Sequence, residues 1–240
     1  MQGTLQWLDD SLAFPDPSTA LKTPNGLLAV GGDLAPMRLL QAYQRGIFPW
    51  FDEDQPPLWW TPDPRMVLFP AELHISNSLR KTLRKSSWVV RSDTAFAEVL
   101  AACAAPRKGS QGTWITRDMQ SAYLRLHELG FAHSVEVWDE DNLVGGLYGL
   151  AIGKVFFGES MFSRKSNASK IAFVHAVKTL AAAGAELIDC QVANPHLESL
   201  GARAIPRSTF MRFLPVCVEV PKPAYWPYNT DSTYTARTLA

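Results

Sequence analysis

The chain has few cysteines, no long apolar run and no excess of charge of either sign. Its cysteines, Cys103, Cys190 and Cys217, are far apart in a chain of 240 residues and form no CxxC pair. A sparse and odd set of cysteines argues against a disulfide framework or a cysteine zinc site, and we expect reduced thiols. The sequence therefore predicts a cytoplasmic protein that binds no metal.

Two further absences concern membranes. No apolar stretch reaches the roughly 18 residues that a membrane-spanning helix needs. The first residues, MQGTLQWLDDSLAFPDP, contain no basic segment followed by an apolar one, so we expect no signal peptide. The sequence thus predicts no membrane partner.

The charges balance, because Lys and Arg together number 23 and Asp and Glu together also number 23. This balance excludes a strongly charged tail, but a local basic surface remains compatible with it. The chain also lacks a GxxxxGK[ST] loop, the signature of a nucleotide-binding P-loop, so nothing in it indicates the use of ATP.

What the sequence does contain divides into two parts of different character. The segment 1–62 is rich in Pro and Trp, as in FPDP, IFPWF and QPPLWWTPDP, around one amphipathic helix expected at PMRLLQAYQRG. We expect it to form a small lobe with little regular structure that packs on a larger neighbour. The segment 63–240 is the second part, and we expect a mobile tail after Pro221.

The pattern becomes regular from residue 63. It predicts a strand at RMVLFP, a helix at NSLRKTLRKS, a strand at SWVVRS, and helices at TAFAEVLAACA and TRDMQSAYLRLHELG. Three strands follow in AHSVEVWDEDNLVGGLYGLAIGKVFFGESMFS, then a long helix, SNASKIAFVHAVKTLAAAG, a strand, ELIDCQV, and a short helix, PHLESLG. An antiparallel run followed by a β-α-β crossover predicts an α+β fold, in which helices flank a mixed sheet.

The order of these elements resembles the GNAT-like acyltransferase fold, in which a hairpin and a strand precede a long helix, a further strand and a short helix. Ordinary members of that superfamily have a glycine-rich turn before the long helix, and its backbone amides bind the pyrophosphate of coenzyme A. The corresponding stretch here, SRKSNASK, contains no glycine. This departure disfavours a coenzyme A donor, and we expect no cofactor.

Several longer motifs are more specific than the fold. They are PNGLLAVGGDL, AYQRGIFPWF, LWWTPDPR, GTWITRDM, YLRLHELGFAHSVEVW, LVGGLYGLAIG, FFGESMFSRKSNASK and LIDCQVANPHLESLGARAIPR. On these motifs the chain resembles the leucyl/phenylalanyl-tRNA–protein transferase family. The resemblance implies an aminoacyltransferase that moves Leu, Phe or less often Met from aminoacyl-tRNA to the α-amino group of proteins with N-terminal Arg or Lys, which marks them for N-degron degradation. It implies aminoacyl-tRNA and such acceptor proteins as partners, and we expect a monomer.

One buried strand candidate, Leu187 to Val192, contains an acid and an amide two residues apart. Alternate residues of a strand share a face, so Asp189 and Gln191 should point together while Cys190 points away. Aminolysis of an ester by an α-amine with a pKa of roughly 7.7–8.0 needs positioning more than a strong base. The amide oxygen of Gln is suited to accept a hydrogen bond from the amine, and the resemblance assigns both residues to catalysis. Capping of a neighbouring loop is the plainer alternative, and the terminal hydroxyl of the tRNA is a rival proton shuttle.

Glu159 ends an apolar strand, where a carboxylate is able to hydrogen-bond an amine. The resemblance implies that Glu159 contacts the amino group of the donor aminoacyl moiety. The alternative is that Glu159 is a surface acid paired with Arg164 or Lys165. The resemblance completes the substrate-binding set with Trp50, Trp114, Leu147, Phe156, Gly158, Ser160 and Ile188. The apolar members would line a pocket for the donor side chain, or else belong to the ordinary core. Trp50 and Trp114 equally suit stacking on the terminal adenosine.

Basic residues on the helix expected at NSLRKTLRKS recur four positions apart and form two ridges side by side. They are Arg80, Lys81, Arg84 and Lys85. Such a patch binds phosphates without regard to sequence, which suits the capture of several tRNAs, although a solvated helix face is the plainer alternative. The histidines show no metal-ligand spacing, and we expect His127 and His133 to be structural.

Two other functions remain open at this point. A coenzyme A-dependent N-acetyltransferase of the same fold is disfavoured by the missing glycines and would bind coenzyme A. A non-catalytic tRNA-binding module would keep the basic helix, but it would give no reason for Glu159, Asp189 and Gln191 to stand at strand sites.

Overall fold

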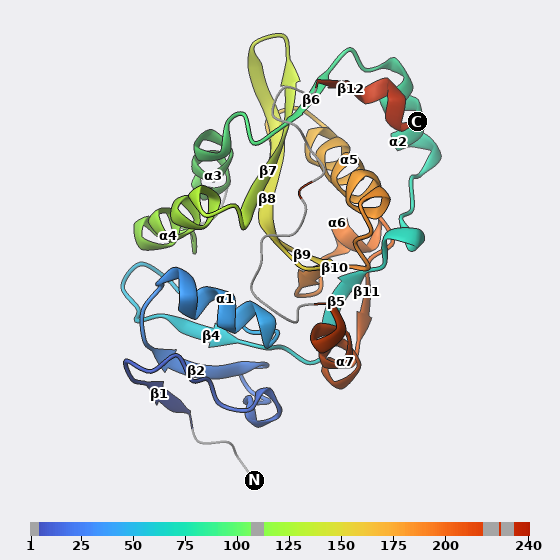
Figure 1. Cartoon of the computed structure of the whole chain (residues 1–240). Helices are drawn as coiled ribbons and strands as arrows, with labels where there is room; N and C mark the ends of the chain where they lie inside the picture. The colour runs from blue at the N-terminus through green and yellow to red at the C-terminus, as the bar shows by residue number, and fades with distance from the viewer. Residues whose placement is uncertain (1–4, 107–112, 218–225, 227–232) are drawn as a thin grey trace.

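The computed structural model describes residues 5–106, 113–217, 226 and 233–240 (Figure 1). Within these residues the chain forms a small four-stranded sheet near the N-terminus and a large eight-stranded sheet. Every helix in the described part of the chain is too short or too polar to span a bilayer.

The N-terminal lobe is more regular than we expected. Its strands, in spatial order, are β1 (Gln6–Leu8), β2 (Leu27–Gly31), β4 (Leu58–Trp60) and β3 (Phe48–Pro49). The predicted helix is present as α1 (Pro36–Gln44), which buries Leu39, Leu40 and Tyr43. The expectation of little regular structure is wrong, because strands as short as these have too few alternating residues to stand out among prolines.

The large sheet is mixed. Its strands, in spatial order, are β11 (Arg203–Ile205), β5 (Arg65–Leu68), β10 (Leu187–Gln191), β9 (Val155–Ser163), β8 (Asn142–Ile152), β7 (Ala132–Asp139), β6 (Val89–Ser92) and β12 (Tyr234–Thr235). β10 runs parallel to β9, while the other strand pairs described in this sheet are antiparallel. The predicted α+β fold is confirmed.

Helices flank the large sheet (Figure 1). On one face lie α3 (Phe96–Ala104) and α4 (Arg117–Glu128), and on the other lie α2 (Asn77–Lys85) and α5 (Ala168–Ala182). The remaining helical segments are α6 (Pro195–Glu198), α7 (Arg207–Cys217) and the 3-10 turns η1 (Pro17–Thr19), η2 (Pro70–Glu72) and η3 (Ala236–Leu239). The order β9, α5, β10, α6 is the crossover that the sequence predicted.

Two buried cores lie on the two faces of the large sheet. One is shared by the N-terminal lobe, α3, α4 and the sheet, and includes Tyr43, Tyr123 and Phe157. The other lies between the sheet, α2 and α5, and includes Leu83 and Ile188. Because the lobe contributes to a common core, it is buttressed by its larger neighbour, and the division at residue 62 stays a prediction.

The end of the chain is docked on the large sheet, which the sequence did not lead us to expect. β12 pairs with β6, and Ala236 and Leu239 are buried in the core beside α2 and α5. For residues 234–239 the expected mobile tail is therefore wrong, because strand pairing and burial fix them on the sheet. The predicted mobile tail also includes 221–225 and 227–232, which lie outside the described residues.

Candidate active site

A cavity of about 460 Å³ opens where β9 and β10 separate. The two strands pair only from Leu187 opposite Val155 to Asp189 opposite Phe157, so the next residues of each strand line a gap. Most of the predicted substrate-binding and catalytic residues line this cavity: Trp114, Leu147, Phe156, Gly158, Glu159, Ser160, Ile188 and Gln191. The structure therefore brings together residues that are distant in the sequence.

Two of the predicted catalytic and substrate-binding residues do not line the cavity. Trp50 is 42% exposed and packs on Trp60, with ring centroids 5.8 Å apart. Asp189 is fully buried behind the cavity wall. Neither residue therefore forms part of the wall of a pocket for the donor side chain. Stacking of Trp50 on an adenosine stays a prediction.

One side of the cavity is apolar. Leu147, Phe156 and Ile188 are each almost completely buried, and Phe173 from α5 joins them. Sequence analysis missed Phe173, because its place in a long apolar helix does not differ from that of an ordinary core residue. These side chains make a pocket for an apolar group, and they belong to the sheet core at the same time.

The polar side of the cavity is centred on the buried carboxylate of Glu159. Its Oε1 accepts hydrogen bonds from Tyr43 Oη and Gln191 Nε2, each at 2.8 Å, and its Oε2 accepts one from Tyr123 Oη at 2.7 Å. Desolvation raises the pKa of Glu159 to about 7, although the three hydrogen bonds act in the opposite direction. This carboxylate therefore changes its charge near neutral pH.

The interpretation of Glu159 as a surface acid is wrong. Arg164 donates to the carbonyl oxygen of Leu143 instead, and Lys165 pairs with Asp139. The carboxylate points inward from a β-bulge: opposite β8, Gly158 pairs with Gly149 and Ser160 pairs with Tyr148, so Glu159 is the extra residue.

Tyr43 and Tyr123 are functional candidates that sequence analysis missed. They come from α1 and α4, on opposite sides of the contact between the N-terminal lobe and the large sheet, and their hydroxyl oxygens lie in contact with each other. Burial raises the pKa of both phenols well above the ordinary value, and the nearby charge of Glu159 adds to this effect. Both hydroxyls consequently stay protonated and keep donating hydrogen bonds.

Asp189 forms a buried, bidentate ion pair with Arg65. Arg65 Nε lies 2.8 Å from Oδ1 and Nη2 lies 2.6 Å from Oδ2. Oδ1 also accepts the backbone N–H of Gln191 at 3.0 Å. Asp189 thus contacts the backbone of Gln191, whereas the side-chain amide of Gln191 is held by Glu159. Asp189 therefore has the geometry of a positioning residue.

Arg65 links three parts of the chain behind the cavity. It is fully buried, it donates to the carbonyl oxygen of Gly46 at 3.0 Å, and its guanidinium lies over the rings of Phe48 and Phe210 at 4.8 and 4.7 Å. The sequence gives only a weak signal for this role, a cation at the start of the apolar strand RMVLFP. The ion pair with Asp189 ties the N-terminal lobe and α7 to the strand that carries Gln191.

A β-bulge sets the direction of Gln191. Opposite β5, Asp189 pairs with Val67 and Gln191 pairs with Met66, so Cys190 is the extra residue. Gln191 has φ 63°, a left-handed conformation that costs about 1–3 kcal/mol for a residue other than glycine. This strain is retained at the point where the amide meets Glu159, while Cys190 packs in the core beside α5, as expected.

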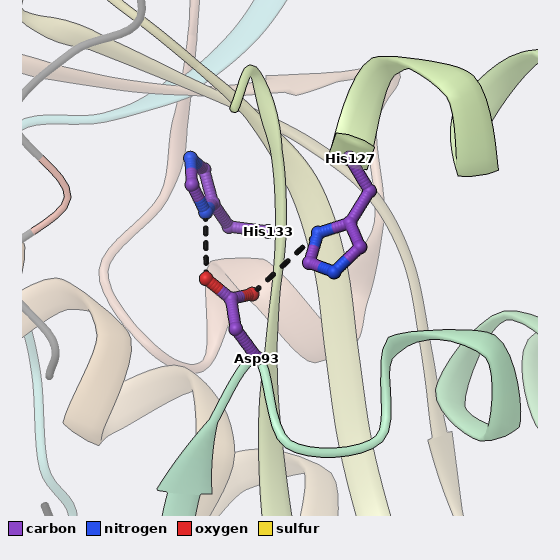
Figure 2. Close-up of side chains that lie close together, drawn as sticks. All are labelled: Asp93, His127 and His133. Atoms are coloured by element: carbon purple, nitrogen blue, oxygen red, sulfur yellow. Dashed lines mark hydrogen bonds and ion pairs between the residues drawn. The ribbon is translucent and has the colours of Figure 1, made fainter. Parts of the chain in front are cut away.

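A group of side chains that is close enough for a metal ion lies elsewhere in the described residues, at Asp93, His127 and His133 (Figure 2). His133 Nδ1 lies 2.8 Å from the carboxylate of Asp93, and its Nε2 lies 3.1 Å from the carbonyl oxygen of Gly130. His127 Nδ1 lies 2.8 Å from the carbonyl oxygen of Ala132. Each of these nitrogens has a hydrogen-bond partner within the chain, as is usual for structural histidines.

Trp226 connects this histidine pair to the cavity wall. Its ring stacks on His133 with centroids 4.1 Å apart and on Phe156 with centroids 5.9 Å apart. The far side of a pocket residue is thus supported by the C-terminal part of the chain.

The start of α5 offers little to a pyrophosphate. Asn167, at the cap position, makes no side-chain cap hydrogen bond. Ser163 Oγ accepts a hydrogen bond from the N–H of Ser169 at 2.8 Å. The N–H of Ala168 donates to the carbonyl oxygen of Lys165 at 3.1 Å. Amides that would bind a phosphate at a helix N-terminus are engaged within the chain, which argues further against a coenzyme A donor.

The predicted basic surface is present on α2. Arg80, Lys81, Arg84 and Lys85 are all exposed, while Leu79 and Leu83 turn inward. In Figure 1, α2 lies beside the C-terminus and is separated from α3 and α4 by α5 and the sheet. The described residues that line the cavity include none of α2, so the basic surface and the cavity are separate.

Comparison with known proteins gives a consistent family. A model described as Leucyl/phenylalanyl-tRNA protein transferase matches residues 67–215, and a model of that transferase's N-terminal domain matches residues 32–63. A protein of Stutzerimonas stutzeri (strain A1501), named Leucyl/phenylalanyl-tRNA–protein transferase, is 59% identical over 223 residues, which are 92% of this chain and 99% of the relative. A protein of that name from Nitrosospira multiformis is 61% identical over 210 residues, 88% of this chain and 90% of the relative.

Solved structures give only a distant likeness. A GCN5-related N-acetyltransferase from Kribbella flavida aligns with a TM-score of 0.39 and 11% identity, over 68% of this chain and 58% of that chain. A likeness of this size carries no argument about the site.

Proposed function

Because the chain belongs to the leucyl/phenylalanyl-tRNA protein transferase family, and is therefore an aminoacyltransferase, we propose that it transfers Leu, Phe or less often Met from aminoacyl-tRNA to proteins with N-terminal Arg or Lys. The acceptor is the α-amino group, and the new N-terminal residue marks the protein for N-degron degradation. The enzyme acts as a cytoplasmic monomer and uses no cofactor.

The hydrogen bond between Gln191 and Glu159 is the observation that most directly supports this function. It lies at the polar side of a cavity whose other side is lined by Leu147, Phe156 and Ile188. An aminoacyl ester has the same two characters, an α-ammonium next to an apolar side chain. Glu159 binds the ammonium as a carboxylate, and the apolar side chain fills the rest of the cavity.

The chemistry needs one bond to form and one to break. The acceptor amine nitrogen bonds to the ester carbonyl carbon, the bond from that carbon to the ribose oxygen breaks, and the amine proton ends on that oxygen. The ester supplies the driving force, so ATP is not required. The enzyme's part is to align the amine with the carbonyl carbon.

Gln191 aligns the amine. Its Nε2 donates to Glu159, so the opposite atom of the amide, Oε1, is the one that accepts a hydrogen bond from the acceptor amine. An amide does not titrate, so the proton passes to the ribose oxygen directly or through the neighbouring hydroxyl of the tRNA. Asp189 acts indirectly, as a positioning residue, because it accepts a hydrogen bond from the backbone N–H of Gln191.

Two surfaces receive the tRNA. Trp114, which lines the cavity, and the exposed Trp50 stack on the terminal adenosine. The cations of α2 bind phosphates of the acceptor arm, and this binding is independent of sequence and sensitive to salt. Recognition of this kind suits an enzyme that takes several tRNAs.

The direct test is the transfer of labelled Phe from Phe-tRNA to a peptide that begins with Arg, beside the same peptide that begins with Ala. We expect labelled product from the Arg peptide only. Transfer to both peptides would contradict the acceptor class. No transfer to either, with folded protein and intact Phe-tRNA, would contradict the proposed reaction.

Replacing Gln191 by Ala or by Gly should lower turnover by about 10²-fold without changing the Kd for tRNA, because either change removes the amide that positions the amine. The two variants should differ in stability. Gly adopts the φ of 63° without strain, so Gln191→Gly should be more stable than Gln191→Ala by about 1 kcal/mol. Single-turnover transfer and denaturant unfolding measure the two effects.

If the two variants lose turnover equally but differ in stability, the turnover loss comes from the missing amide and the stability difference comes from the strained backbone. Wild-type turnover in Gln191→Gly would contradict the role of the amide.

A further inference from the structure

The C-terminal segment 233–240 lies against the end of the basic helix α2. Arg237 Nε donates to the carbonyl oxygen of Ser86 at 3.0 Å, and Ser86 is the C-terminal cap of α2. The N–H of Ala236 donates to the carbonyl oxygen of Trp88 at 2.9 Å. Figure 1 shows the C-terminus beside α2, close to the helix end where Arg84 and Lys85 stand.

This segment is held firmly in place. Ala236 and Leu239 are buried, and Tyr234 packs on the ring of His175 with centroids 4.8 Å apart. Lys178 of α5 donates to the carbonyl oxygen of Leu239 at 2.8 Å. A cation carried by such a segment needs little further ordering when it binds a ligand.

Arg237 itself is exposed. Only Nε has a hydrogen-bond partner among the residues that the structure describes, so Nη1 and Nη2 remain available. A guanidinium with two open N–H groups suits the oxygens of a phosphate. The sequence of α2, NSLRKTLRK, contains no acid that would compete for these groups.

We propose that Arg237 extends the tRNA-binding surface of α2, so that the end of the chain contacts a phosphate of the same tRNA that Arg84 and Lys85 contact. The inference rests on the proposed function of α2 as a tRNA-binding surface. It concerns a segment beyond residue 215, where the match to the family model ends. The ligand chemistry is a sugar-phosphate backbone, which a fixed row of cations follows without reading bases.

The test is the equilibrium Kd for uncharged tRNA, measured across a salt series, in the full-length chain. The variants are Arg237→Gln, which removes the charge, and Arg237→Lys, which keeps it. Arg212→Gln is the matched control, because Arg212 is an exposed arginine on α7, at the opposite end of the molecule from α2 in Figure 1. A double charge reversal, Arg84→Glu with Lys85→Glu, tests the surface itself.

Arg237→Gln should bind tRNA more weakly at low salt. The slope of its log association constant against log salt concentration should be less steep by about 0.9, the value of one phosphate contact. Between 50 and 200 mM salt, the wild type should lose about threefold more affinity than this variant. Arg237→Lys and Arg212→Gln should keep the slope of the wild type. Thermal unfolding should be unchanged in Arg237→Gln, which separates a lost phosphate contact from a displaced C-terminal segment.

Two failures are distinguishable. If the charge reversal weakens binding while Arg237→Gln keeps the Kd and slope of the wild type, the inference about Arg237 is wrong and the α2 surface stands. If the charge reversal also leaves binding unchanged, α2 is not a tRNA-binding surface and the proposal falls with it.

Discussion

Replacing Asp189 by alanine is expected to lower the free energy of unfolding by about 3–5 kcal/mol and to reduce transfer below detection. The change leaves the guanidinium of Arg65 buried without its counter-ion, and an uncompensated buried charge has a cost of this size. It also removes the acceptor of the Gln191 backbone N–H, so the strained bulge loses a support. Urea unfolding at pH 7.5 measures the first effect, and single-turnover transfer by the folded protein measures the second.

The matched control removes both charges. In Arg65→Met with Asp189→Leu, most of the lost stability should return, because a well-packed apolar pair of similar volume often replaces a buried ion pair without loss. Transfer should stay low, since Gln191 is still without its backbone acceptor. Binding of tRNA should persist in both proteins, as α2 is remote from this pair. Unfolding of Asp189→Ala at the denaturant concentration of the wild type would contradict the structural role of the ion pair.

The sequence predicted strands β5 to β10 of the large sheet, because these strands and the helices between them are long enough to show their periods, but it missed β11, β12 and helix α7. It also predicted that Cys190 would turn away from Asp189 and Gln191, although the bulge at Cys190, rather than regular alternation, sets the direction of Gln191. The N-terminal strands escaped prediction because they are short and interrupted by prolines. The docking of the C-terminus escaped it because η3 places just Ala236 and Leu239 in the described core, which is too few apolar residues to form a recognisable pattern.

The partners of the site residues were beyond the reach of sequence patterns. Arg65 and Asp189 are 124 positions apart, and Tyr43 and Glu159 are 116 apart. No local period connects such pairs, and a buried Tyr in an amphipathic helix has the pattern of a core residue. The resemblance to a family supplied the residues that line the cavity, and the structure supplied the residues that hold them.

These contacts explain why a small lobe belongs to the site. Tyr43 from the lobe and Tyr123 from α4 share the carboxylate of Glu159, while Arg65 binds the lobe through Gly46. Separating the lobe from the sheet would break both sets of hydrogen bonds at once. The charge of Glu159 and the position of Gln191 therefore depend on the packing between the two parts of the chain.

Glu159→Gln is expected to stabilise the protein at pH 8 by up to about 3 kcal/mol and to have little effect near pH 4. The pKa of Glu159 is about 7 in the folded protein, against an ordinary value of 4.5. A raised folded-state pKa contributes stability below the unfolded value, and this contribution is lost as the pH rises through 7, because the folded state must then hold a desolvated carboxylate. The neutral amide avoids this cost, and urea unfolding at both pH values measures the difference.

The same substitution should lower kcat/KM for aminoacyl-tRNA by about 10- to 100-fold above pH 7, where it removes the charged partner of the donor ammonium. In the wild type, kcat/KM measured at saturating acceptor peptide should rise with pH through about 7 as Glu159 ionises, and Glu159→Gln should lose this rise. Tyr123→Phe is the matched control. It keeps the carboxylate but removes a hydrogen bond that lowers its pKa, so the rise should move to higher pH. If Glu159→Gln has the pH profile and stability of the wild type, the ionised carboxylate does not bind the donor ammonium and its desolvation does not destabilise the folded protein.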